Sequence, residues 1–246
     1  MPAPFLSIII PAYNEERRLP KTLEQVFAFL DAENYTAEVI VVENGSSDQT
    51  FSLAQELSKK YSHLRVLRND EAGKGHAVQR GMLEATGEYR IFCDADLSMP
   101  IEEIRRFIPP NLDADIVIAS REVEGAIRYD EPEYRHFTGR VFNLLIRFLA
   151  LPKLHDTQCG FKAFRAEIAE DLFKYQRVKG WAFDVEILFI AKMRGYEVIE
   201  LPIPWYYRNE SKVKVLRDSW RMFLDILKVR KNARQGKYSL PHKGEG

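Results

Sequence analysis

Cysteine is scarce in this chain of 246 residues, and long apolar runs are missing. The two cysteines, Cys93 and Cys159, are too few for a disulfide framework and fit no metal-binding spacing, which favours a reducing compartment. No stretch approaches the ~20 apolar residues of a membrane-spanning helix, and no signal peptide is visible after Met1. The sequence also lacks internal repeats and low-complexity segments. We therefore expect a soluble or peripheral protein in the cytoplasm.

The chain also lacks net charge, because 36 basic residues balance 36 acidic residues. The charges are unevenly placed: from Trp205 to Tyr238, ten Lys and Arg residues stand against three acidic residues, a local excess of +7. Such a basic end is typical of a surface that meets phosphates, nucleic acid or lipid headgroups, although a solvated helix face would look the same. Its aromatic residues fall at helical core spacing and form no stacking platform, so we expect no nucleic-acid partner.

Apolar, β-rich runs alternate with segments of helical spacing in the first half of the chain. Alternation of this kind predicts mostly parallel strands joined by helices, in a doubly wound α/β sheet. The expected strands lie at 5–10, 38–42, 64–67, 89–93 and 115–119, and the expected helices at 19–30, 51–57 and 73–85.

After Arg121 the alternation lapses, and the segment that follows is predicted to lie over the site. We expect one domain over residues 1–235 and a flexible tail over 236–246. The second half is predicted to contain an apolar helix at 137–151, a polar turn at 155–160, a helix at 181–194, a strand at 198–201 and a basic helix at 215–234.

Two aspartates follow the expected strand Tyr89–Cys93, in the motif Asp94-Ala-Asp96-Leu-Ser98. Ligands of open α/β sheets bind beyond the carboxyl ends of the strands, so this motif is well placed to hold Mg²⁺ or Mn²⁺. We expect the two aspartates to point to opposite faces, so that one binds the metal and the other a sugar hydroxyl. A polar turn before Pro100 would explain the motif equally well.

Three further polar loops follow expected strands or open expected helices. Pro11-Ala-Tyr13-Asn-Glu15 offers a ring to stack on a base and a carboxylate for base or ribose. Glu43-Asn44 and Asp48 offer polar groups for a base edge or ribose, although helix capping alone would explain Asp48. Gly73-Lys74-Gly75 opens a helix and suits an anion, but its spacing is not that of a Walker loop.

Taken in this order, the motifs resemble glycosyltransferase family 2, the inverting nucleotide-sugar enzymes with a GT-A fold, from Leu6 to about Lys214. Asp156-Thr-Gln-Cys-Gly-Phe-Lys162 and Trp181-Ala-Phe-Asp-Val-Glu186 resemble the dolichyl-phosphate β-glucosyltransferase branch, with the dolichyl-phosphate mannose synthases as near relatives. The resemblance implies a nucleotide-sugar-binding half at 1–121 and an acceptor-binding half at 122–235. Glu43-Asn44 departs from the family, which usually has two aspartates at this turn.

The resemblance also implies a role for individual residues. The expected metal site is Asp96 with Ser98 alongside and with Asp94, which would also serve the sugar or ribose. Arg121 matches an arginine that contacts phosphate, and Asp156 an aspartate sometimes assigned as a base. The expected substrate-binding residues are Pro11, Tyr13, Glu15, Glu43, Asn44, Asp48, Lys74, Arg135, Arg140, Arg208 and Lys212.

The expected reaction is an in-line displacement that moves a hexose, glucose from UDP-glucose, onto a polyprenyl phosphate. A phosphomonoester has a second pKa of ~6, so it is largely anionic at neutral pH and needs little help from a general base. A family 2 transferase acting on a soluble sugar or protein hydroxyl would instead need Asp156 or Asp184 as the base. The other alternative is a non-catalytic nucleotide-sugar-binding protein.

Two segments predict contact with a membrane surface. The stretch Val141–Leu151 is apolar around most of its circumference but too short and too polar to span a bilayer. The basic helix carries Trp220, Phe223, Leu224 and Leu227 on one stripe, with Arg217, Arg221, Lys228 and Lys231 elsewhere, which is typical of interfacial helices. Packing of both stripes against the sheet, or against a second subunit of a homo-oligomer, would account for them equally well.

Overall fold

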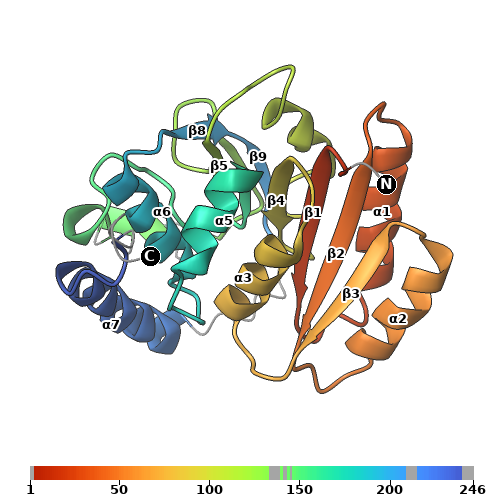
Figure 1. Ribbon diagram of the computed structural model, residues 1–246, viewed down its shortest axis with the longest axis horizontal. Helices are drawn as coiled ribbons and strands as arrows, with labels where there is room; N and C mark the ends of the chain where they lie inside the picture. Colours follow the sequence, from red (N-terminus) through yellow and green to blue (C-terminus); the bar gives the residue numbers. More distant parts are fainter. Residues whose placement is uncertain (1–2, 133–138, 141–142, 145, 209–214, 240–246) are drawn as a thin grey trace, which may run out of the picture.

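The computed structural model describes residues 3–132, 139–140, 143–144, 146–208 and 215–239 of the chain (Figure 1). Its main sheet has the strand order β3-β2-β1-β4-β7-β5-β8. The strands are β1 (Leu6–Ala12), β2 (Ala37–Asn44), β3 (Leu64–Asn69), β4 (Tyr89–Cys93), β5 (Ile116–Ser120), β7 (Phe161–Arg165) and β8 (Val198–Pro202). A separate two-stranded sheet pairs β6 (Ile127–Tyr129) with β9 (Pro204–Tyr206).

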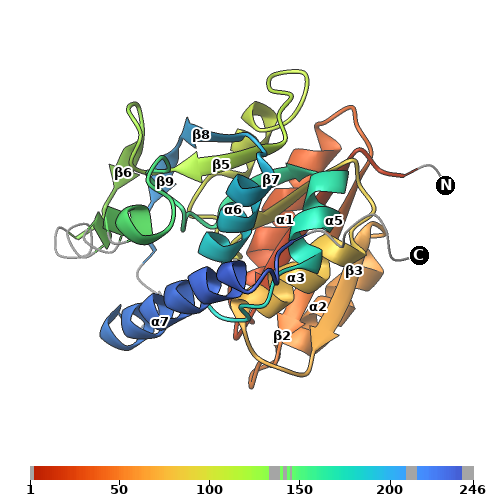
Figure 2. The same ribbon diagram turned by 60° about the vertical axis from the view of Figure 1, so that its left-hand side comes forward.

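Helices cover both faces of the main sheet, as Figures 1 and 2 show. Alternate residues of β1 point to opposite faces, so Ile9 lies in one apolar core while Ile8 and Ile10 lie in the other. The first core includes side chains of α3 (Lys74–Glu84), α5 (Ala166–Lys174), α6 (Phe183–Arg194) and α7 (Val215–Arg234). The second includes side chains of α1 (Leu19–Asp31), α2 (Thr50–Lys60) and the 3₁₀-helix η1 (Ile101–Arg106).

The predicted fold class is confirmed, since β3, β2, β1 and β4 pair in parallel, as do β5 and β8. The exception is β7, which lies between β4 and β5 and runs antiparallel to both. Neither β7 nor α5 was expected from the sequence. For β7 the reason is Lys162: this second residue of Phe161-Lys-Ala-Phe-Arg165 interrupts the apolar run, yet it is 1% exposed in the sheet.

The C-terminal end of the described chain folds back onto α6, where a flexible tail from residue 236 was expected. Tyr238 is 2% exposed, and its hydroxyl donates a hydrogen bond of 2.5 Å to Glu186 Oε1. Glu186 also accepts hydrogen bonds from the backbone N–H groups of Arg177 and Val178 through Oε2. Tyr238 thus packs against the domain within the segment predicted to be a flexible tail, and residues 240–246 lie outside the described part.

In the described ranges, no helix is both long enough and apolar enough to cross a membrane.

Candidate active site

The first two site loops are tied together by hydrogen bonds at the carboxyl edge of β1 and β2. The Asn14 N–H donates to Ser46 Oγ over 3.0 Å, and the Ser47 N–H donates to Asn14 Oδ1 over 2.9 Å. The Glu15 N–H donates to Thr50 Oγ1 over 2.7 Å. Tyr13 lies beside these bonds with 42% of its side chain exposed, in a position to meet a flat ligand. Pro11 is the penultimate residue of β1, so these predicted nucleotide contacts share one edge of the sheet.

Glu43, Asn44 and Asp48 use their side chains to hold the loops. The Ser46 N–H donates to Glu43 Oε1, and the Gly73 N–H donates to Asn44 Oδ1 over 3.0 Å. Asp48 Oδ1 accepts from the Thr50 N–H over 2.9 Å, which is a turn contact just before α2, whose N-cap residue is Gln49. Contact of these three side chains with a nucleotide stays a prediction.

Lys74 and Asp94 form an ion pair at the centre of the site. Lys74 Nζ lies 2.6 Å from Asp94 Oδ1 and 5.4 Å from the centre of the Trp181 ring. Burial lowers the pKa of Lys74, but the carboxylates of Asp94 and Asp184 outweigh it, so the pKa lies above its ordinary value. Lys74 is also the first residue of α3, where helix N–H groups attract anions. This loop therefore places an ammonium group, paired with Asp94, at the N-terminus of α3.

Gly160 has no side chain and so leaves the space that the Asp94 carboxylate occupies. The Asp94 N–H donates to Gly160 O over 3.1 Å, and a Cβ on Gly160 would lie 2.0 Å from Asp94 Oδ2. Any side chain at residue 160 must therefore displace that carboxylate. The sequence marked Gly160 only as part of a motif, and only the fold shows that β7 brings it against Asp94.

Asp94 and Asp96 line the same small pocket, so the expectation that they point to opposite faces is wrong. Residues two apart on an extended segment share a face, and the chain also turns after Cys93, with the Leu97 N–H donating to Asp94 O over 3.2 Å. Asp96 Oδ1 accepts from the Ser98 N–H over 2.9 Å. The pocket is lined in part by Asp94, Asp96, Ser98, Gly160, Phe161 and Trp205.

Asp94 and Asp96 are the groups that would hold a cation here. Burial and then the charge of Asp94 raise the pKa of Asp96, and hydrogen bonds from Ser98 oppose that shift. In the described ranges, no three His, Cys, Asp or Glu side chains are grouped to hold a metal ion. Mg²⁺ is often held by one or two carboxylates together with substrate phosphates, and this carboxylate pair fits that mode.

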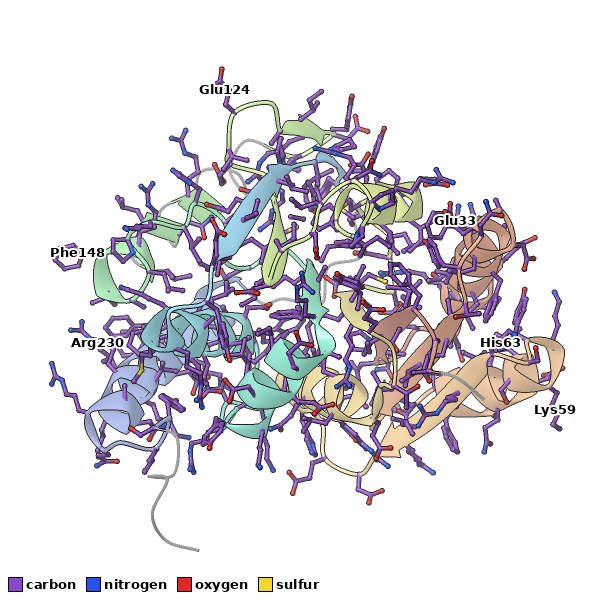
Figure 3. All side chains as sticks on the ribbon, turned by 45° about the horizontal axis from the view of Figure 1, so that its top comes forward. Glu33, Lys59, His63, Glu124, Phe148 and Arg230 are labelled. Carbon is purple, nitrogen blue, oxygen red and sulfur yellow. The ribbon has the colours of Figure 1, made fainter. Side chains whose placement is uncertain are left out.

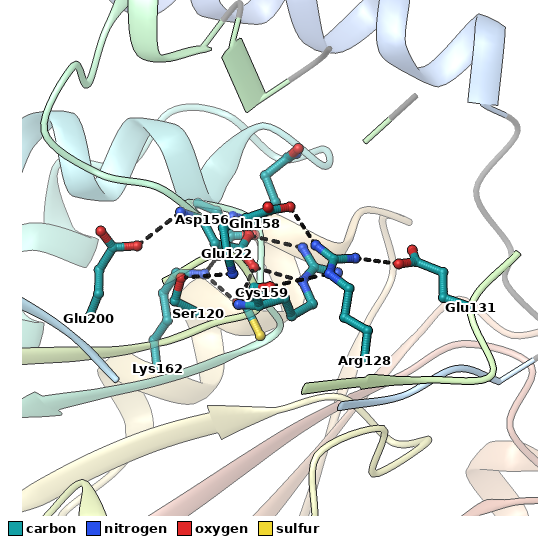
Figure 4. A network of polar contacts seen from close by, with 11 residues as sticks. Ser120, Glu122, Arg128, Glu131, Asp156, Gln158, Cys159, Lys162 and Glu200 are labelled. Carbon is teal, nitrogen blue, oxygen red and sulfur yellow. Dashed lines mark hydrogen bonds and ion pairs between the residues drawn. The ribbon is translucent and has the colours of Figure 1, made fainter. Parts of the chain in front are cut away.

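Arg121 and Asp156 form a buried bidentate pair (Figure 4). Arg121 Nε donates to Asp156 Oδ2 over 2.7 Å and Nη2 to Oδ1 over 2.9 Å, while the Arg121 N–H adds a third bond of 3.0 Å. Burial raises the pKa of Asp156, but Arg121 outweighs it and brings the pKa to about 2. Asp156 is 0% exposed, so it is a fixed anion that orients Arg121 and is poorly suited to act as a base.

Trp205 and Arg128 complete this side of the site and were not found in the sequence. The Arg121 and Arg128 guanidinium carbons lie 5.3 and 5.9 Å from the centre of the Trp205 ring, which lines the pocket. Arg128 Nη1 donates to Glu131 over 2.6 Å, and Nη2 donates to Glu122 (Figure 4). No local motif indicates these residues, because β6 and β9 bring them together across 77 positions of sequence.

Lys162 and Asp184 form a second buried pair beneath the pocket. Lys162 Nζ donates to Asp184 Oδ1 over 2.5 Å and to Cys159 O over 2.6 Å. Burial raises the pKa of Asp184, and the Lys162 ammonium opposes that shift. Asp184, the alternative base of the sequence analysis, is 4% exposed and does not line the pocket.

The remaining predicted site residues are not placed in the pocket. Arg140 and Arg208 are exposed and do not line it. Arg135 and Lys212 lie outside the described residues, so their predicted contacts with phosphate stay predictions.

Comparison with known proteins decides the family. The model of glycosyl transferase family 2 matches residues 7–173. The chain belongs to glycosyl transferase family 2. A dolichyl-phosphate beta-glucosyltransferase of Drosophila melanogaster is 38% identical over 240 residues, covering 91% of this chain and 74% of that protein. One from Trichomonas vaginalis is 34% identical over 254 residues, covering 98% and 75%, and the human one is 31% identical over 247 residues, covering 93% and 76%.

Solved structures of other transferases share the fold of this family 2 member. Glucosyl-3-phosphoglycerate synthase from Mycobacterium tuberculosis, in complex with UDP, has a TM-score of 0.64 at 19% identity, covering 99% of this chain and 83% of that one. A mannosyltransferase from Pyrobaculum calidifontis, with GDP-mannose and Mn²⁺, has a TM-score of 0.57 at 20% identity, covering 95% and 65%. The predicted family and GT-A fold are thus confirmed, and the protein is a glycosyltransferase.

Proposed function

We propose that this transferase moves glucose from UDP-glucose to a polyprenyl phosphate, with a divalent cation, at the cytoplasmic surface of a membrane. The proposal draws on relatives at 30–38% identity that are named dolichyl-phosphate beta-glucosyltransferases. It also draws on fold neighbours crystallised with Mn²⁺ and UDP-glucose.

The observation that carries the proposal is the state of Asp156. With a pKa of about 2 and no exposed surface, it is already deprotonated and tied to Arg121, so it cannot readily collect a proton from an attacking hydroxyl. Asp184 is buried against Lys162, and Asp94 is paired with Lys74. An acceptor that is already anionic needs no such base, and a phosphate with a second pKa of ~6 meets that condition.

The proposed reaction follows from the charged groups at the site. An oxygen of the acceptor phosphate attacks the anomeric carbon as the bond from that carbon to the diphosphate breaks, and UDP leaves with the electron pair. Lys74 would bind the diphosphate at the start of α3, while Arg121, oriented by Asp156, would bind phosphate oxygens from the other side. A cation on Asp94 and Asp96 would supply further neutralisation of the leaving diphosphate.

A donor screen tests the proposal. The purified chain is given UDP-glucose, GDP-mannose or UDP-N-acetylglucosamine with a short-chain polyprenyl phosphate, with Mg²⁺, with Mn²⁺ or with a chelator. We expect a glucosylated lipid phosphate only from UDP-glucose and only with a metal. Preferred turnover of another donor would contradict the sugar assignment, and undiminished turnover in the chelator would contradict the metal.

A further inference from the structure

Two helices at one end of the molecule present large apolar side chains to solvent. Phe148, in a helix whose described residues are 139–140, 143–144 and 146–149, is 86% exposed, and Trp220 of α7 is 62% exposed. The docking face, as we call it, consists of Leu144, Phe148, Trp220, Leu224 and Leu227. The three residues of α7 recur at spacings of four and three, so they form one stripe along the helix.

This stripe is not part of the hydrophobic core, because each of the two helices buries a different apolar face. Met222, Ile226 and Val229 of α7 lie in the same core as Ile146 of the other helix and Ala150 just after it. A surface helix of a globular protein normally carries one apolar stripe, facing the core. The docking face is therefore a second apolar face on both helices, and the core does not account for it.

Both helices lie at the same end of the molecule. Figures 1 and 2 agree in placing α7 and the described part of the helix that contains Phe148 together on the left-hand side. In Figure 3, Phe148 and Arg230 stand at this end, while Lys59 and His63 stand at the opposite end. The apolar side chains of the docking face thus belong to one surface region.

Positive charge surrounds the docking face. Residues 220–239 contain six Lys and Arg residues against Asp225 alone, an excess of +5. Arg221, Lys228 and Lys231 are exposed on α7, and a shallow hollow is lined by Leu227, Arg230, Lys231 and Arg234. A twofold dimer through this face would bring the two positive regions together, which disfavours a second copy as the occupant. An anionic bilayer matches both the apolar stripe and the charge.

The docking face also lies close to the site. Gln158 links α7 to the loop of the buried pair, since its backbone N–H donates to Asp156 Oδ1 over 3.3 Å and its Nε2 lies 3.7 Å from Met222 Sδ. The helix that would rest on lipid thus packs directly on the loop that orients Arg121.

From these observations we propose that the docking face seats the enzyme on an anionic lipid bilayer, with the Leu144, Phe148, Trp220, Leu224 and Leu227 side chains among the headgroups and the surrounding Lys and Arg residues on lipid phosphates. The inference rests on the proposed function in one respect: an enzyme whose acceptor is a lipid must reach the membrane that contains it. It specifies which surface of the protein contacts the membrane, and vesicle binding tests this without any measurement of turnover.

Vesicle co-sedimentation of the full chain tests this assignment. The vesicles are phosphatidylcholine alone or with 30 mol% phosphatidylserine, at low and at high salt. We expect binding that requires phosphatidylserine and falls with salt. Arg221→Glu with Lys228→Glu should weaken binding at least ~25-fold, taking about fivefold per basic residue. Phe148→Gln with Leu224→Gln should weaken it by a similar order.

Matched variants control for general effects. Lys59→Glu with Lys60→Glu changes two exposed lysines of α2 at the opposite end, and Leu83→Gln changes a side chain of α3 that is 41% exposed. These variants should bind vesicles like the wild type, and all variants should turn over a water-soluble short-chain acceptor equally. The outcome that overturns the docking face is equal vesicle binding by its variants and by the controls, or a protein that ignores anionic vesicles.

Two further readouts separate this proposal from its alternatives. A wild-type mass by light scattering that is dimeric without lipid, and monomeric in Phe148→Gln with Leu224→Gln, would assign the face to a second copy and overturn the membrane. Vesicle binding with no transfer to any polyprenyl phosphate would instead contradict the proposed function and leave the docking face standing.

Discussion

Replacing Asp156 by Asn should lower the free energy of unfolding at neutral pH, and this loss should become smaller in acid. The Asp156 carboxylate has a pKa of about 2 in the folded protein, against an ordinary value of 3.8. Because the folded-state pKa is depressed, the stabilisation is complete above pH ~4 and disappears as the pH falls through ~2. The shift corresponds to about 2 kcal/mol, and leaving the partly buried Arg121 without its counter-charge brings the expected loss to about 3 kcal/mol.

Urea unfolding of Asp156→Asn at pH 7 and at pH 3 measures this effect. The gap in unfolding free energy from the wild type should be widest at pH 7 and should narrow at pH 3. The matched control is Asp113→Asn, which removes a carboxylate that pairs with Arg165 at the surface, and it should change stability little. An Asp156→Asn protein as stable as the wild type at pH 7 would refute the buried pair.

The activity of the same variant tests the role of Asp156. Turnover should fall because Arg121 loses its orientation, and the loss should persist at every pH. If Asp156 instead acts as the base, the residual rate of Asp156→Asn should rise with pH as the acceptor ionises. Rescue at high pH would therefore contradict the argument and indicate a hydroxyl acceptor.

Three other changes follow from the contacts at the site and at the C-terminal end. Asp96→Asn should abolish metal-dependent transfer and donor binding with the fold intact and the melting temperature equal or slightly higher, since clustered functional carboxylates cost stability; an unfolded variant would indicate a structural role. Gly160→Ala should displace the Asp94 carboxylate, which a Cβ would approach to 2.0 Å, and raise the donor KM in a folded protein, whereas a normal KM would contradict the contact. Tyr238→Phe should lower the unfolding free energy by ~1 kcal/mol, because its hydroxyl bonds the buried Glu186, and should speed proteolysis of the C-terminal end; unchanged stability and proteolysis would show that the bond contributes nothing.

Regular patterns made much of the fold predictable. The strand Tyr89–Cys93 and the helix Val215–Arg234 match their predicted bounds, because an apolar run ending in aspartates and an amphipathic repeat are local signals. The strand Phe161–Arg165 was not predictable in this way. Its second residue, Lys162, is buried where Asp184, 22 positions later, pairs with its ammonium group.

The candidate site was predictable where its residues follow strands. Asp94, Asp96 and Lys74 were identified from position alone, since the ends of parallel strands meet at one edge. The pairing of Arg121 with Asp156 spans 35 positions, and only the fold reveals it. The same is true of Tyr238, which looked like part of a free tail because nothing near it in sequence indicates its contact with Glu186.

The central claim is that the acceptor is an anionic lipid phosphate, and a paired acceptor assay tests it most directly. Turnover of UDP-glucose is measured with a polyprenyl phosphate and with the free polyprenol of the same chain length, and the anomeric configuration of the product is read by NMR. We expect a β-linked glucosyl phosphate from the first acceptor and no product from the second. Comparable transfer to the free alcohol would contradict the account.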